Sequence, residues 1–100
     1  MNADTTHALD ALGSPVRRQI LLNLRITPLS VGEIATKFPV SRPAISRHLR
    51  ILEDAGLVEC TSTGTRSVYS VRIQGFASAR EFLDGFWDIA LARLQALSKE

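Results

Sequence analysis

Apolar residues recur at helical spacing through the first half of the chain, in short segments separated by glycine and proline. The expected helices cover residues 7–12, 15 to about 24, 31 to about 37 and 42–55. Ser14, Ser30 and Ser41 each precede one of the last three, where a serine side chain can accept a hydrogen bond from a free backbone N–H. Gly56 is expected to end the fourth helix, because glycine tolerates the left-handed conformation after a helix.

After Gly56 the pattern becomes that of two β-strands and then returns to helix. Residues 57–61 and 66–73 are expected to form a hairpin around a turn at 62–65, since the second run is rich in β-branched residues. A long helix is expected from about 76 to 98. The order of elements is therefore ααααββα, which predicts a mainly α fold with a β-hairpin (α+β), as a single domain over residues 1–100.

The expected helix 42–55 has one apolar and one polar face. At about 100° per residue, Ile45, Leu49 and Leu52 fall on the apolar side. The polar side carries three arginines near its start and its acidic residues only near its end; its members are Arg42, Pro43, Ser46, Arg47, Arg50, Glu53 and Asp54. A short helix and a tight turn precede this helix, as in a helix-turn-helix, whose second helix lies in the major groove of DNA.

The residue types on this face suit the reading of DNA. An arginine can donate to O6 and N7 of guanine together, and serine can meet several bases. The residues expected to contact DNA are Lys37, Ser41, Arg42, Pro43, Ser46, Arg47, Arg50 and, in the hairpin, Arg66. The alternative for the helix is a solvated face, and for Arg66 a solubilising residue at the tip of a loop.

The hairpin segment 61–73 is expected to act as the wing beside this helix. It contains no acidic residue, and Arg66 lies next to its turn, where it could reach a phosphate or a narrow minor groove. The charge balance of the whole chain agrees with a polyanionic partner. Residues 17–50 hold seven basic residues against one acidic residue, whereas residues 51–100 hold five against seven, although the net charge is only +2.

The expected last helix is apolar around too much of its circumference for a one-sided surface helix. Its apolar residues span an arc of roughly 220°, against roughly 100° for a helix that packs on one core. The same helix from a second copy would cover the excess in a two-fold dimer. The expected interface residues are Phe82, Phe86, Ile89, Ala90, Arg93, Leu94 and Leu97. The alternative is that this helix packs entirely within one chain.

Composition narrows the remaining functions. No apolar run is long enough to cross a bilayer and the start lacks a secretory pattern, so a cytoplasmic protein is expected, associated with the nucleoid when bound to DNA. Cys60 is the one cysteine, which excludes multi-cysteine zinc motifs. There is no Gly-rich phosphate loop, no Cys–His pair in plausible register and no metal cluster. We expect no enzyme activity, no cofactor and no metal.

Two stretches resemble a known family. Residues 11–21 and 41–58 are similar to the opening and to the recognition helix of ArsR/SmtB-type winged helix-turn-helix repressors, and the similarity covers about residues 8–73. The resemblance implies a homodimer that binds an imperfect palindrome in a promoter and usually represses it. The positions of the family's metal motifs lack the usual ligands: residues 29–35 contain no Cys or His, and Asp84 and Asp88 have no His beside them. A transition-metal sensor is therefore disfavoured.

Two other functions stay open on the sequence alone. The basic helix could bind an acidic protein rather than DNA, so that the winged helix would be a protein–protein interaction module. Cys60 could also make the protein a redox-responsive repressor, although a lone cysteine is more often a small packing residue. The operator, the regulated genes and any small-molecule effector are not encoded in these patterns.

Overall fold

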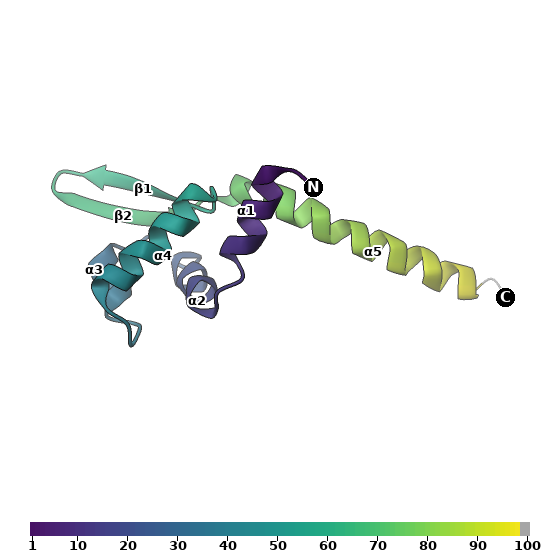
Figure 1. Cartoon of the computed structure of the whole chain (residues 1–100), viewed down its shortest axis with the longest axis horizontal. Helices are drawn as coiled ribbons and strands as arrows, with labels where there is room; N and C mark the ends of the chain where they lie inside the picture. The colour runs from purple at the N-terminus through teal and green to yellow at the C-terminus, as the bar shows by residue number, and fades with distance from the viewer. Residues whose placement is uncertain (99–100) are drawn as a thin grey trace.

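Helices dominate the computed structural model, which describes residues 1–98. The elements are α1 (Ala3–Ala11), α2 (Pro15–Leu24), α3 (Val31–Ala35), α4 (Arg42–Asp54), β1 (Val58–Thr63), β2 (Arg66–Val71), the 3-10 turn η1 (Ile73–Phe76) and α5 (Ala77–Ser98). This order confirms the expected ααααββα arrangement and the α+β class (Figure 1). Residues 99 and 100 of the expected domain lie outside the described part of the chain.

Serine side chains begin three of the helices, as the sequence predicts. The hydroxyls of Ser14, Ser30 and Ser41 accept hydrogen bonds from backbone N–H groups three residues later, at 3.3, 3.2 and 3.3 Å. At α3 the bond is reciprocal, because the Glu33 carboxylate accepts from the backbone N–H of Ser30 at 3.0 Å. This capping box explains how a helix of only five residues starts reliably between two turns.

Several boundaries differ from the sequence expectation. Helix α1 begins at Ala3, four residues before the expected start, because the Asn2 side chain accepts from the backbone N–H of Thr5 at 2.8 Å. The hairpin loop is only Gly64 and Thr65, so β1 runs on to Thr63, which pairs with Arg66. Gly64 has a φ of +62°, which a two-residue hairpin loop of this kind requires at its first position.

The core lies where α1 to α4 meet the base of the hairpin. Ile20, Ile34, Ile45, Leu49 and Leu52 are completely buried, which confirms the apolar side expected for α4. A backbone bridge fixes the hairpin to the helices, since Leu29 and Tyr69 exchange N–H···O bonds of 3.1 and 2.8 Å. The chain between α2 and α3 thereby pairs with the edge of β2 that faces away from β1 and holds the wing against the helix-turn-helix.

Two glycines allow the end of α4 to pass close to the start of α5. Gly56 has a φ of +78°, the left-handed conformation expected after a helix. A Cβ on Gly75 would lie only 1.7 Å from the carbonyl oxygen of Gly56, so no other residue fits there without a shift of the backbone. Arg72 Nη1 donates to the same carbonyl oxygen at 3.2 Å, which ties the end of β2 to the end of α4.

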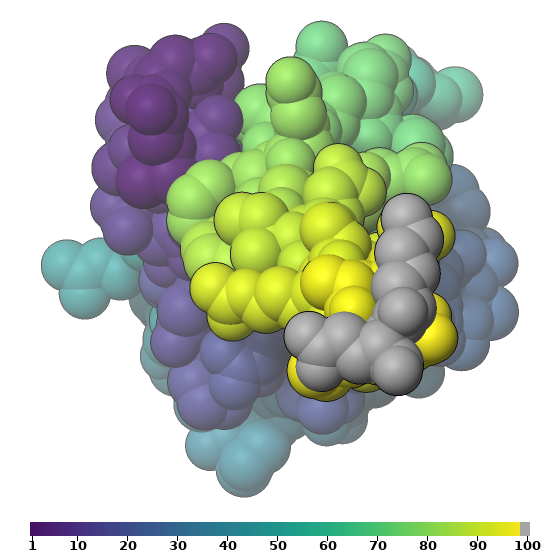
Figure 2. Space-filling view, turned by 90° about the vertical axis from the view of Figure 1, so that its right-hand side faces the viewer, coloured from purple at the N-terminus to yellow at the C-terminus, as the bar shows by residue number. Residues whose placement is uncertain are grey.

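Helix α5 extends away from the rest of the chain (Figure 1). Its 22 residues correspond to about 33 Å of helix, and the molecule measures 64 × 26 × 21 Å. The radius of gyration is 17.2 Å, compared with about 13 Å for a compact chain of this length. The start of α5 packs beside α1, and the rest of the helix stands clear of the body (Figure 1). Seen from its C-terminal end, α5 projects toward the viewer in front of the other elements (Figure 2).

Candidate nucleic-acid interface

Helices α3 and α4 form the helix-turn-helix, with α4 as its second helix. Ile34 from α3 and Ile45 and Leu49 from α4 are completely buried, so the two helices hold each other through apolar side chains. The N-terminus of α4 and the wing both lie at the end of the molecule opposite the C-terminus of α5 (Figure 1). The polar face of α4 is turned away from the core, because Arg47 and Arg50 are exposed whereas Ile45, Leu49 and Leu52 are buried.

The predicted DNA-contacting residues of this region are all exposed. Helix α4 and its N-cap place Ser41, Arg42, Pro43, Ser46, Arg47 and Arg50 on the surface, and Lys37 is exposed just after α3. Glu53 and Asp54 are exposed at the opposite end of the helix. Ser41 and Arg42 lie at the N-terminus of α4, the positive end of the helix dipole, which favours an anion at this end.

The three arginines of α4 are available for such an anion. Within residues 1–98, neither Arg47 nor Arg50 takes part in an ion pair. The guanidinium of Arg42 lies across α3, with Nη1 3.8 Å from the place that a Cβ on Gly32 would occupy. Arg42 therefore spans the groove between the two helices, whereas Arg47 and Arg50 belong to α4 alone.

Other arginines of the basic segment have structural partners that the charge count did not reveal. Arg17 Nε donates to the carbonyl oxygen of Ala11 at 2.7 Å, and Arg18 Nη1 donates to that of Leu12 at 2.8 Å. Both side chains satisfy the carbonyl groups at the end of α1. Each of these hydrogen bonds joins residues six apart in the sequence. The only sequence signal for them is an arginine that follows shortly after the end of a helix.

His48 is half-buried on the inner side of α4, as the helical spacing predicts. Its Nδ1 lies 3.4 Å from Arg17 Nη1 and can accept a hydrogen bond from that guanidinium. Burial lowers the pKa of His48 below its ordinary value, and the positive charges of Arg17 and Arg47 lower it further. A neutral imidazole is therefore favoured at this position.

The wing is tied to the helix-turn-helix through Arg66. This side chain, 62% exposed, forms an ion pair with Glu33 in α3, 33 residues away in the sequence. The pKa of Glu33 is lowered, mainly by the backbone and side chain of Ser30 and also by Arg66. The pair is exposed to water and contributes little to stability, so Arg66 can exchange Glu33 for a phosphate at small cost.

Cys60 is half-buried in β1, opposite Tyr69 in β2. Burial, and then the neighbouring Cys60, raises the pKa of Tyr69 above its ordinary value. Both residues are half-buried, and Tyr69 also bonds to Leu29 through its backbone.

The apolar residues of α5 are exposed over most of its length. Phe86 is 60% exposed and Leu97 is 69% exposed, and the expected interface residues Phe82, Ile89, Ala90, Arg93 and Leu94 are exposed as well. The rings of Phe82 and Phe86 meet edge to face, with centroids 5.2 Å apart. Within the described chain, Ala79 is the one buried residue of this helix. The alternative in which α5 packs wholly within one chain does not agree with this exposure.

Two further findings concern the described residues. Among residues 1–98, no three His, Cys, Asp or Glu side chains lie close enough together to hold a metal ion. No helix over the same residues combines the length and the apolar character needed to cross a membrane.

A helix-turn-helix with an exposed basic second helix, followed by a hairpin wing, defines a winged helix-turn-helix DNA-binding protein. The comparisons with known proteins agree. Residues 14–59 match the model of the family described as "Bacterial regulatory protein, arsR family". The HTH-type transcriptional regulator Rv2034 of Mycobacterium tuberculosis is 48% identical over 84 residues, which are 84% of this chain and 78% of that protein. The chain belongs to the ArsR family of bacterial transcriptional regulators, and its relatives are not enzymes.

Two other relatives are informative. The transcriptional repressor SdpR of Bacillus subtilis is 38% identical over 61 residues, covering 61% of this chain and 68% of SdpR. The solved structure of a homodimeric winged helix-turn-helix domain of Mb0332, from Mycobacterium bovis, is 31% identical with a TM-score of 0.68, and the match covers 93% of this chain and 78% of that one.

Proposed function

We propose that this chain is a homodimeric transcriptional repressor that binds an imperfect palindrome in double-stranded DNA. In this proposal residues 1–100 form one winged-helix domain, and α5 is its dimerisation helix. The observation that carries it is that Arg42, Arg47 and Arg50 are all exposed on α4, the second helix of the helix-turn-helix, which in such proteins lies in the major groove. Repression is supported by the similarity to SdpR, which is named a transcriptional repressor.

Each contact is assigned by the side chain's position. Arg47 and Arg50 are the base-reading residues, because they project from α4 without a partner in the described chain. Lys37, Ser41 and Arg42 lie around the N-terminus of α4 and contact the phosphate backbone, with Pro43 and Ser46 filling the surface between them. Arg66 carries the wing to an adjacent phosphate once it leaves Glu33.

Dimerisation follows from the exposed face of α5. An apolar helix that stands clear of its own domain would bring large apolar side chains into water, and a second copy removes them from it. The similarity to the homodimeric domain of Mb0332 supports this arrangement. The interface comprises Phe82, Phe86, Ile89, Ala90, Arg93, Leu94 and Leu97. A two-fold dimer presents two copies of α4, so the operator has two related half-sites about one helical turn apart.

Regulation in this proposal does not use a transition metal, and the protein works in the cytoplasm, at the nucleoid when bound to DNA. Residues 29–35, where the family resemblance places a thiol-rich metal motif, carry neither Cys nor His and contain the capping box of Ser30 and Glu33. On α5 the remaining candidate ligands are the carboxylates of Asp84 and Asp88. Asp84 already forms an ion pair with Arg80, with 3.6 Å between Oδ2 and Nε. Carboxylates alone, without an imidazole or thiolate, are poor ligands for transition metals.

Selection from random duplexes tests the proposal directly. The purified chain is incubated with a library of random double-stranded DNA, and the bound molecules are enriched and sequenced. We expect enrichment of two inverted half-sites at a fixed spacing, and loss of that enrichment with the double variant Arg47→Ala and Arg50→Ala. Enrichment of single half-sites would contradict the dimeric mode, and no enrichment at all would contradict sequence-specific binding.

A further inference from the structure

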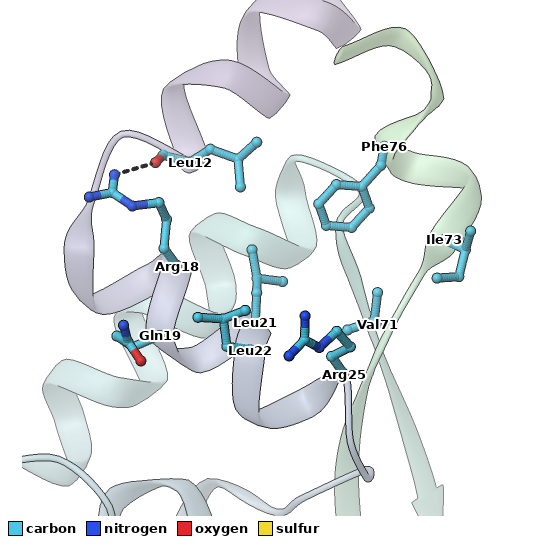
Figure 3. Close-up of a pocket in the computed structure, with 9 residues that line it drawn as sticks. All are labelled: Leu12, Arg18, Gln19, Leu21, Leu22, Arg25, Val71, Ile73 and Phe76. Carbon is cyan, nitrogen blue, oxygen red and sulfur yellow. Dashed lines mark hydrogen bonds between the residues drawn. The ribbon is translucent and has the colours of Figure 1, made fainter. Parts of the chain in front are cut away.

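An apolar cleft opens on the side of the body from which α5 projects. Its volume is about 480 Å³, and its walls are α2 on one side and the end of β2 with η1 on the other. Leu21, Leu22, Val71, Ile73 and Phe76 supply most of the lining (Figure 3). Leu22 and Ile73 are 42% and 75% exposed, so the cleft is open to water at its mouth. Its size lies within the range of small-molecule sites, about 300–1,000 Å³.

The charged groups at this cleft are both cations. Arg18 and Arg25 border it, and none of the described residues that line it is acidic. Arg18 is held back by its bond to the carbonyl oxygen of Leu12, whereas the side chain of Arg25 lies between Leu22 and Val71 (Figure 3). Arg25 takes part in no ion pair within residues 1–98. The Arg25 guanidinium borders an apolar cleft whose lining contains no acidic residue. Such a site suits a molecule that has an apolar body and one negative group.

We propose that this cleft binds an amphipathic carboxylate, with its hydrocarbon or aryl body against Leu21, Val71 and Phe76 and its carboxylate on Arg25. The apolar body loses contact with water in the cleft, which supplies most of the affinity. The guanidinium then selects an anionic head group over a neutral or cationic one, because its donors fit two carboxylate oxygens.

Occupation of the cleft would act on the parts that bind DNA. Helix α2 packs on α4, and β2 forms half of the wing, so a molecule wedged between α2 and β2 changes the angle between wing and α4. Phe76 ends η1, which connects the wing to α5, so the same wedge changes the direction of α5. This regulatory consequence rests on the proposed repressor function, in which the direction of α5 sets the spacing of the two copies of α4. The carboxylate lowers DNA affinity because the occupied cleft favours orientations of the wing and of α5 other than those that fit the operator.

Isothermal titration calorimetry of the full chain with octanoate tests the site without DNA. We expect saturable binding of octanoate, with clearly weaker binding of 1-octanol and of octylammonium. Arg25→Gln should weaken octanoate binding by about tenfold, since it removes a charge-assisted hydrogen bond. Arg80→Gln removes an exposed cation from α5 and serves as the matched control, with octanoate binding unchanged. Leu22→Glu places an acid at the mouth and should abolish octanoate binding while leaving the thermal midpoint in place.

The outcomes separate the two proposals. Absence of saturable octanoate binding, or equal binding of 1-octanol, would overturn the carboxylate site. Dissociation of a dimer by Leu22→Glu would show that a second copy occupies the cleft, and would overturn it too. With operator DNA, octanoate should lower affinity roughly fivefold or more in the wild type but not in Arg25→Gln; unchanged affinity would overturn the regulatory role. A chain that binds octanoate but no duplex would contradict the repressor function alone.

Discussion

Individual arginines in this protein do different work, although the sequence presents them as one basic segment. Some complete the backbone hydrogen bonds of helix ends, one pairs with a glutamate, and those on α4 have no ion-pair partner among residues 1–98. The first group is Arg17, Arg18 and Arg72, and the paired one is Arg66. DNA affinity should therefore depend on a few of these residues rather than on the total charge.

Removal of one α4 arginine should weaken specific DNA binding without loss of the fold. For Arg47→Ala or Arg50→Ala we expect a loss of about 1–3 kcal/mol in binding to the selected duplex. Arg80→Ala, which removes another exposed arginine, from α5, should change specific binding little. Fluorescence anisotropy with labelled duplex measures the affinity, and a thermal melt checks the fold. A collapse of the melting midpoint in Arg47→Ala would refute its placement on the exposed face.

His48 should make the protein less stable on the acidic side of neutrality. Its pKa in the folded chain lies below the ordinary value of 6.5, so the unfolded chain binds the proton more readily. The stabilisation is complete above pH 6.5 and is lost as the pH falls toward the lowered pKa. Urea denaturation at about pH 7.5 and about pH 5.5, at one fixed protein concentration, should show a larger drop for the wild type than for His48→Gln. Equal drops in both proteins would contradict this role.

Residue roles were predictable where spacing alone decides them and not where distant segments meet. The buried side of α4 and the inward position of His48 follow from a period of about 3.6 residues. The pair of Arg66 with Glu33 joins residues 33 apart in the sequence and depends on how the wing folds over α3. No periodicity in one segment contains that information.

At the level of elements, local chemistry determines where most helices begin and end. Each serine expected to cap a helix does so, because the cap needs only a hydroxyl three residues before a free N–H. Helix α1 begins four residues before the start that the pattern predicts, since Asn2 precedes polar residues with no apolar repeat to mark a helix. The short turn η1 was not expected, because its form depends on the close approach of Gly75 to Gly56.

Two glycines in similar sequence surroundings should respond oppositely to substitution. Gly75→Ala places a methyl group against the carbonyl oxygen of Gly56, and we expect a loss of about 1–3 kcal/mol in the free energy of unfolding. Gly85 lies inside α5 with open space around it, so Gly85→Ala should stabilise by about 0.5–1 kcal/mol. Urea denaturation of the two variants measures both values. A neutral Gly75→Ala would contradict the close approach of α4 and η1.

The shape of the whole molecule indicates a partner, because 22 of its 100 residues form a helix, α5, that extends away from the other elements. The width of the apolar arc predicted the need for a second surface, and the exposure of Phe86 and Leu97 agrees with it. The direction of α5 could not be predicted, since it is set by η1 and by the contact with α1. That direction determines where a second α4 would lie.

A charge in the middle of the apolar arc should separate the dimer. We expect Phe86→Glu to yield a monomer, because the dimer would have to bury an unpaired carboxylate. Gln95→Glu adds the same charge on the polar side of α5 and should leave the dimer intact. Sedimentation velocity gives the mass of each variant. A dimer in Phe86→Glu would place the interface elsewhere on the protein.

The salt dependence of duplex binding tests the central claim, that the exposed arginines of two copies of α4 bind DNA together. The affinity for the selected duplex is measured over a series of salt concentrations and plotted as log K against log [salt]. With about six to eight phosphate contacts in the dimer, the slope should be roughly −5 to −7. A slope near −1 for every duplex tested would contradict the account.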